Sequence, residues 1–282
     1  MKQAYMKYLS ALLLFGSNGI VASHISLSSF EIVYLRTLIG SIFLITIFLL
    51  SGRKITFFHH KKDCIFLLLS GISMGCSWIF LYEAYTQIGV SIASLIYYCG
   101  PIIVMLLSPI LFKEKLSFGK LLGFVCVLIG LVLVNETITQ TTDSSRGLLC
   151  GIASAVMYAL MVIFNKKTLF IKGLENATLQ LMISFFTVAI FVSFKQSLFI
   201  HIPSKSLLPI FFLGLINTGL GCYLYFSSLS KIPVQTISIC GYLEPLSAVC
   251  LSAFFLNERL SYIQIIGTGL ILGGAIYAEL KQ

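Results

Sequence analysis

Apolar residues occur along this chain in long blocks, separated by short polar stretches. A membrane-spanning helix needs about 20 consecutive, mostly apolar residues, and blocks of that length follow one another from end to end. We therefore predict an all-α integral membrane protein with ten transmembrane helices. The predicted segments are 5–24, 30–50, 64–86, 90–112, 118–135, 146–165, 175–194, 207–230, 233–256 and 261–279.

Two of these boundaries depend on turn residues, because the apolar stretch around them carries few polar residues. The sequence IGV at 88–90 divides the third segment from the fourth, and KIP at 231–233 divides the eighth from the ninth. Glycine and proline are the residues that most often interrupt a helix. The first block follows two lysines, as a signal peptide would. It is long enough to span, however, and nine similar blocks follow, so we expect it to be retained as a helix.

Charged residues are few and unevenly placed. The chain of 282 residues is 58% hydrophobic and 10% charged, with a net charge of +9, whereas soluble domains carry about 25% charged residues. With a cytoplasmic N-terminus, fourteen Lys and Arg residues fall on the cytoplasmic side, four fall outside, and Arg36 lies within a helix. Because cytoplasmic loops are enriched in basic residues, we predict a multi-pass inner or plasma membrane protein with both termini cytoplasmic. The basic residues then contact anionic lipid headgroups and not nucleic acid.

The second half of the chain repeats the first. A shift of 144 residues aligns 71–134 with 215–278 without a gap, and 15 of the 64 positions are identical. We predict a first repeat at 1–140 and a second at 146–282, each with five helices. Because five is odd, the second repeat enters the membrane from the opposite side. Inverted repeats of this kind place a binding site at the midplane between the halves and permit alternating access.

The clearest repeated pattern is P-x(12)-E-[KR]-L-S, which runs from Pro101 to Ser117 and again from Pro245 to Ser261. Together with GSN at 16–18 and Arg36, these blocks resemble the drug/metabolite transporter superfamily, specifically its EamA-like branch of ten-helix transporters. The resemblance covers nearly the whole chain. It implies export of amino acids, other metabolites or toxic compounds, in many members driven by the proton gradient.

Ionisable residues within the apolar segments are the candidate functional groups, because a charge in the bilayer is costly unless it is paired or hydrated. Glu244 lies near the middle of its segment, directly before Pro245, which interrupts helical hydrogen bonding, and its repeat partner is Gly100. Glu83 lies near the extracellular end of its segment, and Arg36 lies about two turns into its own. We interpret all three as candidate substrate-binding groups, with Arg36 and either acid forming a site for a zwitterion. Glu244 and Glu83 are also the proton-coupling candidates.

Each of these three residues has a structural alternative. Glu244 would then cap a helix or bond to a neighbouring one, Glu83 would be a solvated rim residue paired with a base, and Arg36 would belong to a structural ion pair. The repeated acids Glu114 and Glu258 lie at helix ends, where we expect them to terminate helices and pair with neighbouring helices.

Uncharged polar and aromatic residues in the same segments are further candidates, since aromatic faces attract organic cations. The alternative for tyrosines near helix ends is a role as interfacial anchors. Tyr98 and Tyr242 are favoured because they are repeat-related and lie close to the symmetric prolines. The predicted substrate-binding residues of this kind are Asn18, Trp78, Tyr98, Asn217 and Tyr242, with Tyr97, Tyr158 and Tyr223 as additional candidates.

Other function classes lack the motifs they require. No two of the eight cysteines have CxxC spacing and none clusters with histidine, so we predict no metal site and no cofactor. An ATP-driven pump needs a GxxxxGK[ST] loop, which is missing. We therefore predict a secondary transporter, most simply an exporter, and not an enzyme. The alternative is an integral membrane enzyme or accessory subunit acting on lipid-linked intermediates. The predicted partners are a small-molecule substrate and the lipid bilayer; monomer and homodimer both remain open.

Overall fold

The computed structural model describes residues 2–53, 55–57, 60–134, 144–195, 200–255 and 261–280, and these ranges contain helices and no strand. In chain order the helices are α1 (Lys2–Gly16), α2 (Asn18–Ser23), α3 (Ser29–Leu50), α4 (Lys61–Ile88), α5 (Val90–Tyr97), α6 (Gly100–Phe112), α7 (Phe118–Val134), α8 (Ser145–Lys166), α9 (Gly173–Lys195), α10 (Ser204–Phe212), the π-helix η2 (Leu213–Leu220), α11 (Gly221–Leu229), α12 (Val234–Cys240), α13 (Leu243–Phe255) and α14 (Tyr262–Leu280).

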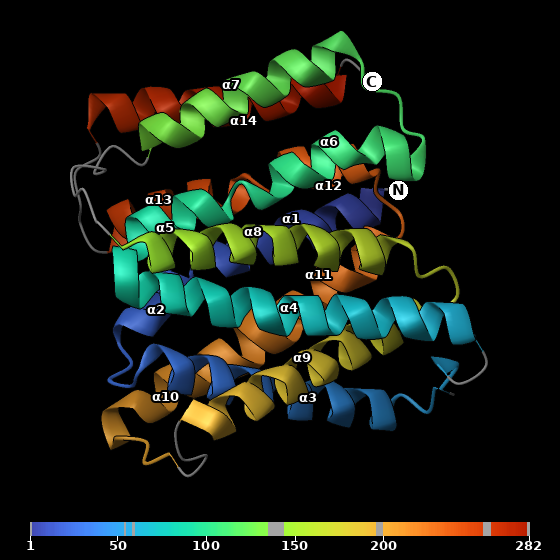
Figure 1. Ribbon diagram of the computed structural model, residues 1–282, viewed down its shortest axis with the longest axis vertical. Coiled ribbons are helices and arrows are strands. Elements are labelled where there is room, and N and C mark those ends of the chain that lie inside the picture. The colour runs from blue at the N-terminus through green and yellow to red at the C-terminus, as the bar shows by residue number, and fades with distance from the viewer. Residues whose placement is uncertain are drawn as a thin grey trace.

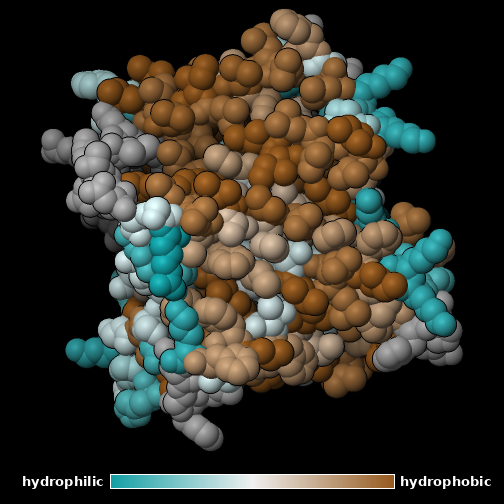
Figure 2. Space-filling view, in the orientation of Figure 1, coloured by the Kyte–Doolittle hydropathy of each residue, from teal (hydrophilic) through white to brown (hydrophobic). Residues whose placement is uncertain are grey.

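Several of these helices are long and apolar enough to cross a membrane. Seven such stretches occur in the described ranges, and two shorter apolar helices, Phe118–Val134 and Tyr262–Ala278, accompany them. Large apolar side chains cover the outside: Ile110, Leu208 and Phe254 are each more than three-quarters exposed. Figure 2 shows this apolar face between hydrophilic residues that gather at the two ends of the helices. Apolar surface of this extent requires lipid, so the predicted all-α membrane class is confirmed.

The helix boundaries follow the turn chemistry of the sequence. α4 ends at Ile88 and α5 begins at Val90, with Gly89 between them at φ +79, a conformation that glycine adopts without steric cost. α11 ends at Leu229 and α12 begins at Val234, after Pro233. Both predicted joints are therefore confirmed.

Three predicted segments are interrupted in the structure. The first breaks at Ser17 between α1 and α2, the fourth at 98–99 between α5 and α6, and the ninth at 241–242 between α12 and α13. The last two breaks are repeat-related, since they contain Tyr98 and Tyr242, which lie 144 residues apart. The interruption expected at Pro245 thus falls at 241–242, just before α13, and Pro245 lies in the first turn of α13, where proline is tolerated.

The helices lie side by side, with α7 and α14 packed together at one edge of the bundle (Figure 1). α1 begins and α14 ends at the same end of the bundle. The main core cluster lies toward that end, and its members come from both halves of the chain, including Tyr8, Phe48, Leu229 and Ile237.

Glycines set the contact between α7 and α14. A Cβ on Gly123 would lie 2.6 Å from the Gly274 carbonyl oxygen, and one on Gly130 would lie 2.6 Å from that of Gly267. Gly123 and Gly130 are themselves the repeat partners of Gly267 and Gly274. Each glycine therefore faces the partner of the other, which is the pairing that a two-fold axis between two antiparallel helices produces. Small residues permit this close approach in membranes.

The crossing makes Gly130 intolerant of any side chain. We expect Gly130→Ala to destabilise the protein by about 1–3 kcal/mol, the usual cost of overpacking, because the added methyl group meets backbone that cannot rotate away. Gly273→Ala on α14 is the matched control, since nothing lies within 4 Å of its Cβ position. Thermal unfolding in detergent measures the difference. Equal midpoints for both variants would contradict the close crossing.

Acidic side chains connect the two halves at the end where α1 begins. The Glu114 carboxylate accepts hydrogen bonds from the backbone N–H groups of Val234 (2.7 Å) and Gln235 (3.0 Å), the first two residues of α12. Asp63 likewise accepts from Leu169 (2.7 Å) and Phe170 (2.5 Å). The Glu114 carboxylate thereby satisfies amides at the N-terminus of α12 that have no partner within the helix, and Asp63 binds amides of the connection between α8 and α9. The interhelical role predicted for Glu114 is confirmed, whereas its repeat partner Glu258 lies outside the described residues.

Candidate functional site

A cavity of about 430 Å³ lies between the two halves. It is lined by residues of α1, α2, α3, α4, α5, α8, η2, α11 and α13. It reaches the surface where α2 ends and α3 begins, beside Val90, which is 61% exposed. We call this the open end of the bundle. At the opposite, closed end the Tyr8 hydroxyl donates to the Ile237 carbonyl at 2.8 Å, and buried apolar residues fill the space between the helices.

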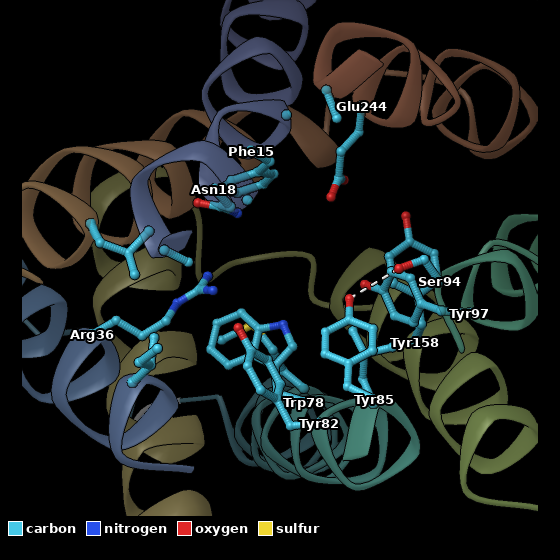
Figure 3. Close-up of a pocket in the computed structure, with 18 of the residues that line it drawn as sticks. Phe15, Asn18, Arg36, Trp78, Tyr82, Tyr85, Ser94, Tyr97, Tyr158 and Glu244 are labelled. Atoms are coloured by element: carbon cyan, nitrogen blue, oxygen red, sulfur yellow. Dashed lines mark hydrogen bonds between the residues drawn. The ribbon is translucent and has the colours of Figure 1, made fainter. Parts of the chain in front are cut away.

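Glu244 projects into the cavity from the first turn of α13 (Figure 3). Its carboxylate forms no hydrogen bond or ion pair with the residues that the structure describes. The break before α13 directs this side chain inward. At the equivalent position on α6, a Cβ on Gly100 would lie 2.6 Å from the ring of Tyr158. The structure thereby explains why only one repeat carries an acid here: the other has no room for a side chain.

Arg36 enters the cavity from α3, on a different side from Glu244 (Figure 3). The residue is 5% exposed. Its Nε donates to Thr218 Oγ1 at 3.0 Å, and its Cζ lies 4.8 Å from the centre of the Trp78 ring, a cation–π contact. In the described ranges no carboxylate forms an ion pair with Arg36. The structural ion pair considered from sequence is therefore not observed there, and the terminal nitrogens face the cavity.

Aromatic rings cover much of the remaining wall. Tyr97 and Tyr158 pack edge to face with centroids 5.3 Å apart, and the hydroxyls of Tyr158 and Tyr225 lie 3.3 Å apart. Ser94 donates to the Tyr85 hydroxyl at 3.2 Å. The rings present both apolar surface and hydroxyl groups, so this wall can accept an apolar or aromatic group of a ligand together with a cation.

The break in the first segment forms another part of the wall. Asn18 lines the cavity, but the buried Asn217 does not. Asn217 Nδ2 instead lies 2.9 Å from the Leu14 carbonyl, 2.8 Å from Ser17 Oγ and 3.0 Å from Asn18 Oδ1. The amide therefore holds the break in place from behind and supports Asn18.

Two of the predicted tyrosines are also outside the cavity. Tyr242 is fully buried, and its hydroxyl donates to the Tyr98 carbonyl at 2.9 Å, which ties the two repeat-related helix breaks together. Tyr223 contacts Lys7, whose Nζ lies 3.4 Å from the hydroxyl. Tyr98 itself lines the cavity, so the two members of the symmetric pair have different surroundings.

Glu83 lies apart from the cavity lining, near the open end. Its carboxylate forms ion pairs with Arg146 (3.3 Å) and Lys195 (3.2 Å), and Gln87 Nε2 donates to it at 3.4 Å. Ion pairs with exposed bases are typically worth about 0–1 kcal/mol. These contacts correspond to the paired rim residue that was the alternative for Glu83.

Sequence reasoning missed several lining residues, among them Phe15, Tyr85, Ser94 and Tyr225. They lie in predicted membrane segments that also carry predicted site residues, and only the direction each side chain faces distinguishes them from other polar or aromatic residues nearby. Within the described ranges, no three His, Cys, Asp or Glu residues lie close enough together to hold a metal ion.

The sequence is similar to a transporter family and to proteins named as transporters. The model described as the EamA-like transporter family matches residues 3–136 and again 145–278. "Uncharacterized transporter YxxF" of Bacillus subtilis is 29% identical, over 96% of this chain and 88% of its own. A "Probable amino-acid metabolite efflux pump" of Escherichia coli is 25% identical, over 65% of each chain. A solved structure titled "Crystal structure of protein" superimposes with a TM-score of 0.84 at 19% identity, covering 98% of this chain and 97% of that one.

Proposed function

This chain belongs to the EamA-like transporter family, and we propose that it is a secondary transporter that exports small metabolites, such as amino acids or amphiphilic compounds, by alternating access. One observation carries the proposal. A carboxylate and a guanidinium, neither held in an ion pair among the described residues, face the same aromatic-lined cavity. Buried charges are normally paired, so a ligand that supplies both counter-charges fits this cavity.

The chemistry of the wall favours a zwitterion with an apolar side chain. A ligand ammonium would pair with Glu244, and a ligand carboxylate would pair with Arg36. The apolar group would lie against the tyrosines and Phe15. A cavity of about 430 Å³ lies within the range of about 300–1,000 Å³ that is usual for small-molecule sites. Asn18, Trp78 and Tyr98 complete the proposed substrate site. Asn217 and Tyr242 lie outside the cavity and hold Asn18 and Tyr98 in position through hydrogen bonds.

We further propose that the chain crosses the membrane ten times, with repeats 1–140 and 146–282 in opposite orientations. The reciprocal glycine pairing between α7 and α14 supports an axis of two-fold symmetry. The common position of the first and last helix ends supports an even number of crossings. The placement of basic residues favours cytoplasmic termini in the cell membrane, with the open end of the cavity outside.

Repeat-related residues test this topology. Ser28 and Lys172 lie 144 positions apart, and both are exposed. In a background with the eight native cysteines replaced, we expect Ser28→Cys to react with an impermeant thiol reagent added to intact cells. Lys172→Cys should react only after permeabilisation. Labelling of both cysteines from the same side would contradict the inverted arrangement.

Alternating access requires the closed end to open when the outer end closes. The contacts that would have to rearrange include the Tyr8 bond to Ile237 and the Glu114 bonds to α12. We propose that proton binding at Glu244 couples this motion to the proton gradient, since its carboxylate has no fixed partner. Glu83 is the other coupling candidate, but its two ion pairs make it the weaker one.

Flux measurements in proteoliposomes test the function. L-Phenylalanine, 2-phenylethylamine and 3-phenylpropionate share one ring and carry both charges, the ammonium only and the carboxylate only. We expect phenylalanine to be transported fastest, and an imposed pH gradient to change its rate. Equal rates for the three compounds would argue against a zwitterion site, and no saturable flux of any metabolite in a wider panel would argue against transport.

A further inference from the structure

We propose that Thr218 is a specificity-determining residue that orients Arg36, so that the two terminal nitrogens of the guanidinium present a fork to a carboxylate in the cavity. Neither the repeat nor the charged residues of the sequence single Thr218 out. The inference rests on the proposed function, because it takes the cavity as the substrate site. It adds a positioning residue to that site and a selectivity that the residue controls.

The direction of the hydrogen bond is determined by the chemistry of both groups. Arginine has only donors, and a threonine hydroxyl has one proton and two lone pairs. Thr218 donates its proton to the Leu213 carbonyl at 2.8 Å. A lone pair of the same oxygen therefore accepts the Nε proton of Arg36, at 3.0 Å. The hydroxyl cannot rotate to donate elsewhere without losing its bond to Leu213, so the position of the acceptor is locked.

The unusual helix η2 places this hydroxyl. Thr218 lies five residues after Leu213, within a π-helix that runs from Leu213 to Leu220. π-Helical turns are rare and often occur at functional sites. The repeat-related stretch 69–76 lies inside the continuous α-helix α4. At this position, therefore, the described residues of the second repeat form a π-turn and those of the first do not, and the π-turn lies opposite Arg36 of the first repeat.

Thr218 and Trp78 together leave one edge of the guanidinium available. Trp78 contacts the guanidinium through its ring, with Cζ 4.8 Å from the ring centre, and Thr218 binds Nε. The side of the group that remains carries the two terminal nitrogens, and it faces the cavity (Figure 3). Paired N–H groups in this fork match the two oxygens of a carboxylate. Without Thr218, Arg36 can turn about its long side chain and present a single nitrogen.

The fluorescence of Trp78 tests the geometry without any substrate, because it is the only tryptophan in the chain. We expect Thr218→Val, which keeps the shape and removes the hydroxyl, to shift the emission of Trp78 and its quenching by acrylamide. Thr218→Ser retains the hydroxyl and should resemble the wild type. A Thr218→Val spectrum and quenching identical to those of the wild type would overturn the proposal.

Thr37→Val is the matched control. Thr37 is as fully buried as Thr218 and adjoins Arg36 in the sequence, but its hydroxyl bonds only to the Val33 and Tyr34 carbonyls of its own helix. We expect Trp78 fluorescence to be unchanged in this variant. A shift as large as that of Thr218→Val would show that any buried hydroxyl nearby has the same effect, and the proposal would fall.

Transport of the three phenyl compounds tests the selectivity. In Thr218→Val we expect the KM for phenylalanine and 3-phenylpropionate to rise about tenfold, the factor that corresponds to one hydrogen bond to a charged group. The KM for 2-phenylethylamine and all maximal rates should be unchanged, and Thr218→Ser should restore the wild-type values. An equal loss for all three compounds would indicate a merely structural role and would overturn the proposal.

Comparison with Arg36→Met separates this proposal from the proposed function. If Arg36→Met impairs the carboxylate compounds selectively and Thr218→Val does not, the positioning role of Thr218 is wrong and the zwitterion site stands. If neither variant distinguishes the compounds, the carboxylate site at Arg36 is itself wrong, and the role of Thr218 falls with it.

Discussion

Glu244→Gln is expected to abolish measurable transport of L-phenylalanine in proteoliposomes. The substitution keeps the size of the side chain but removes the negative charge that faces the cavity. Removing one partner of a buried charge pair costs about 2–5 kcal/mol, and about 1.4 kcal/mol corresponds to a factor of ten in affinity. Binding of a substrate ammonium should therefore weaken by roughly 30- to 3,000-fold. Transport of 2-phenylethylamine should fall with that of phenylalanine, whereas the affinity for 3-phenylpropionate, which has no ammonium, should be unchanged.

Two further variants show whether the effect of Glu244→Gln is specific to Glu244. Glu31→Gln is the matched control: Glu31 forms the capping box that opens α3, outside the cavity lining, and glutamine serves equally well in that motif. Glu83→Gln tests the other coupling candidate. If Glu244→Gln retained phenylalanine flux that still responded to the pH gradient, Glu244 would have no part in the mechanism. If only Glu83→Gln lost the response, coupling would belong to Glu83.

Arg36→Met is expected to make 2-phenylethylamine the preferred substrate of the two singly charged compounds. The methionine side chain keeps an unbranched apolar stem against Trp78 but has no donor for a carboxylate. Phenylalanine and 3-phenylpropionate should lose roughly 30- to 3,000-fold in affinity, by the same reasoning about buried charge pairs. Transport of 2-phenylethylamine should persist, because its ammonium still meets Glu244.

Arg36→Lys separates charge from geometry. Lysine keeps the positive charge but lacks the planar fork and the Nε donor that bonds to Thr218. We expect it to restore part of the carboxylate affinity, well short of the wild-type value. Full restoration would show that a point charge is sufficient. Wild-type transport of 3-phenylpropionate by Arg36→Met would exclude Arg36 from the binding of the carboxylate.

Glu244→Gln and Arg36→Met also change the balance of charge in the cavity. Glu244 and Arg36 are the charged side chains that line it, and removing either leaves the other without a counter-charge nearby. Some loss of stability is therefore expected in each single variant. Thermal unfolding in detergent, measured beside the flux, shows whether a variant that fails to transport is still folded.

The class of the protein and the positions of its helices follow from the sequence alone. Transfer of a side chain into lipid depends mainly on that residue, so a long apolar run predicts a helix without knowledge of its neighbours. Gly89 and Pro233 mark helix ends because the backbone preferences of glycine and proline are also properties of the residue itself. The intramembrane residues Glu244 and Arg36 could be located as candidates because charge is costly in lipid wherever it lies.

The membership of the site was decided by tertiary structure. Lipid and protein interior are both apolar, so the sequence of a spanning helix shows only weakly which side faces inward. Glu83 and Glu244 therefore looked alike, yet packing brings Glu83 to Arg146 and Lys195 and leaves Glu244 facing the cavity. Tyr98 and Tyr242 are repeat-related, but only Tyr98 lines the cavity.

Contacts between distant parts of the chain account for the rest. Thr218 is 182 positions from Arg36, and its hydroxyl is placed by a π-turn that no pattern of residues predicted. The absence of a side chain at Gly100 depends on the ring of Tyr158, which lies in the other repeat. Apolar runs thus determined which segments enter the membrane, whereas the rotation and packing of those segments against one another determined which of their side chains share a cavity.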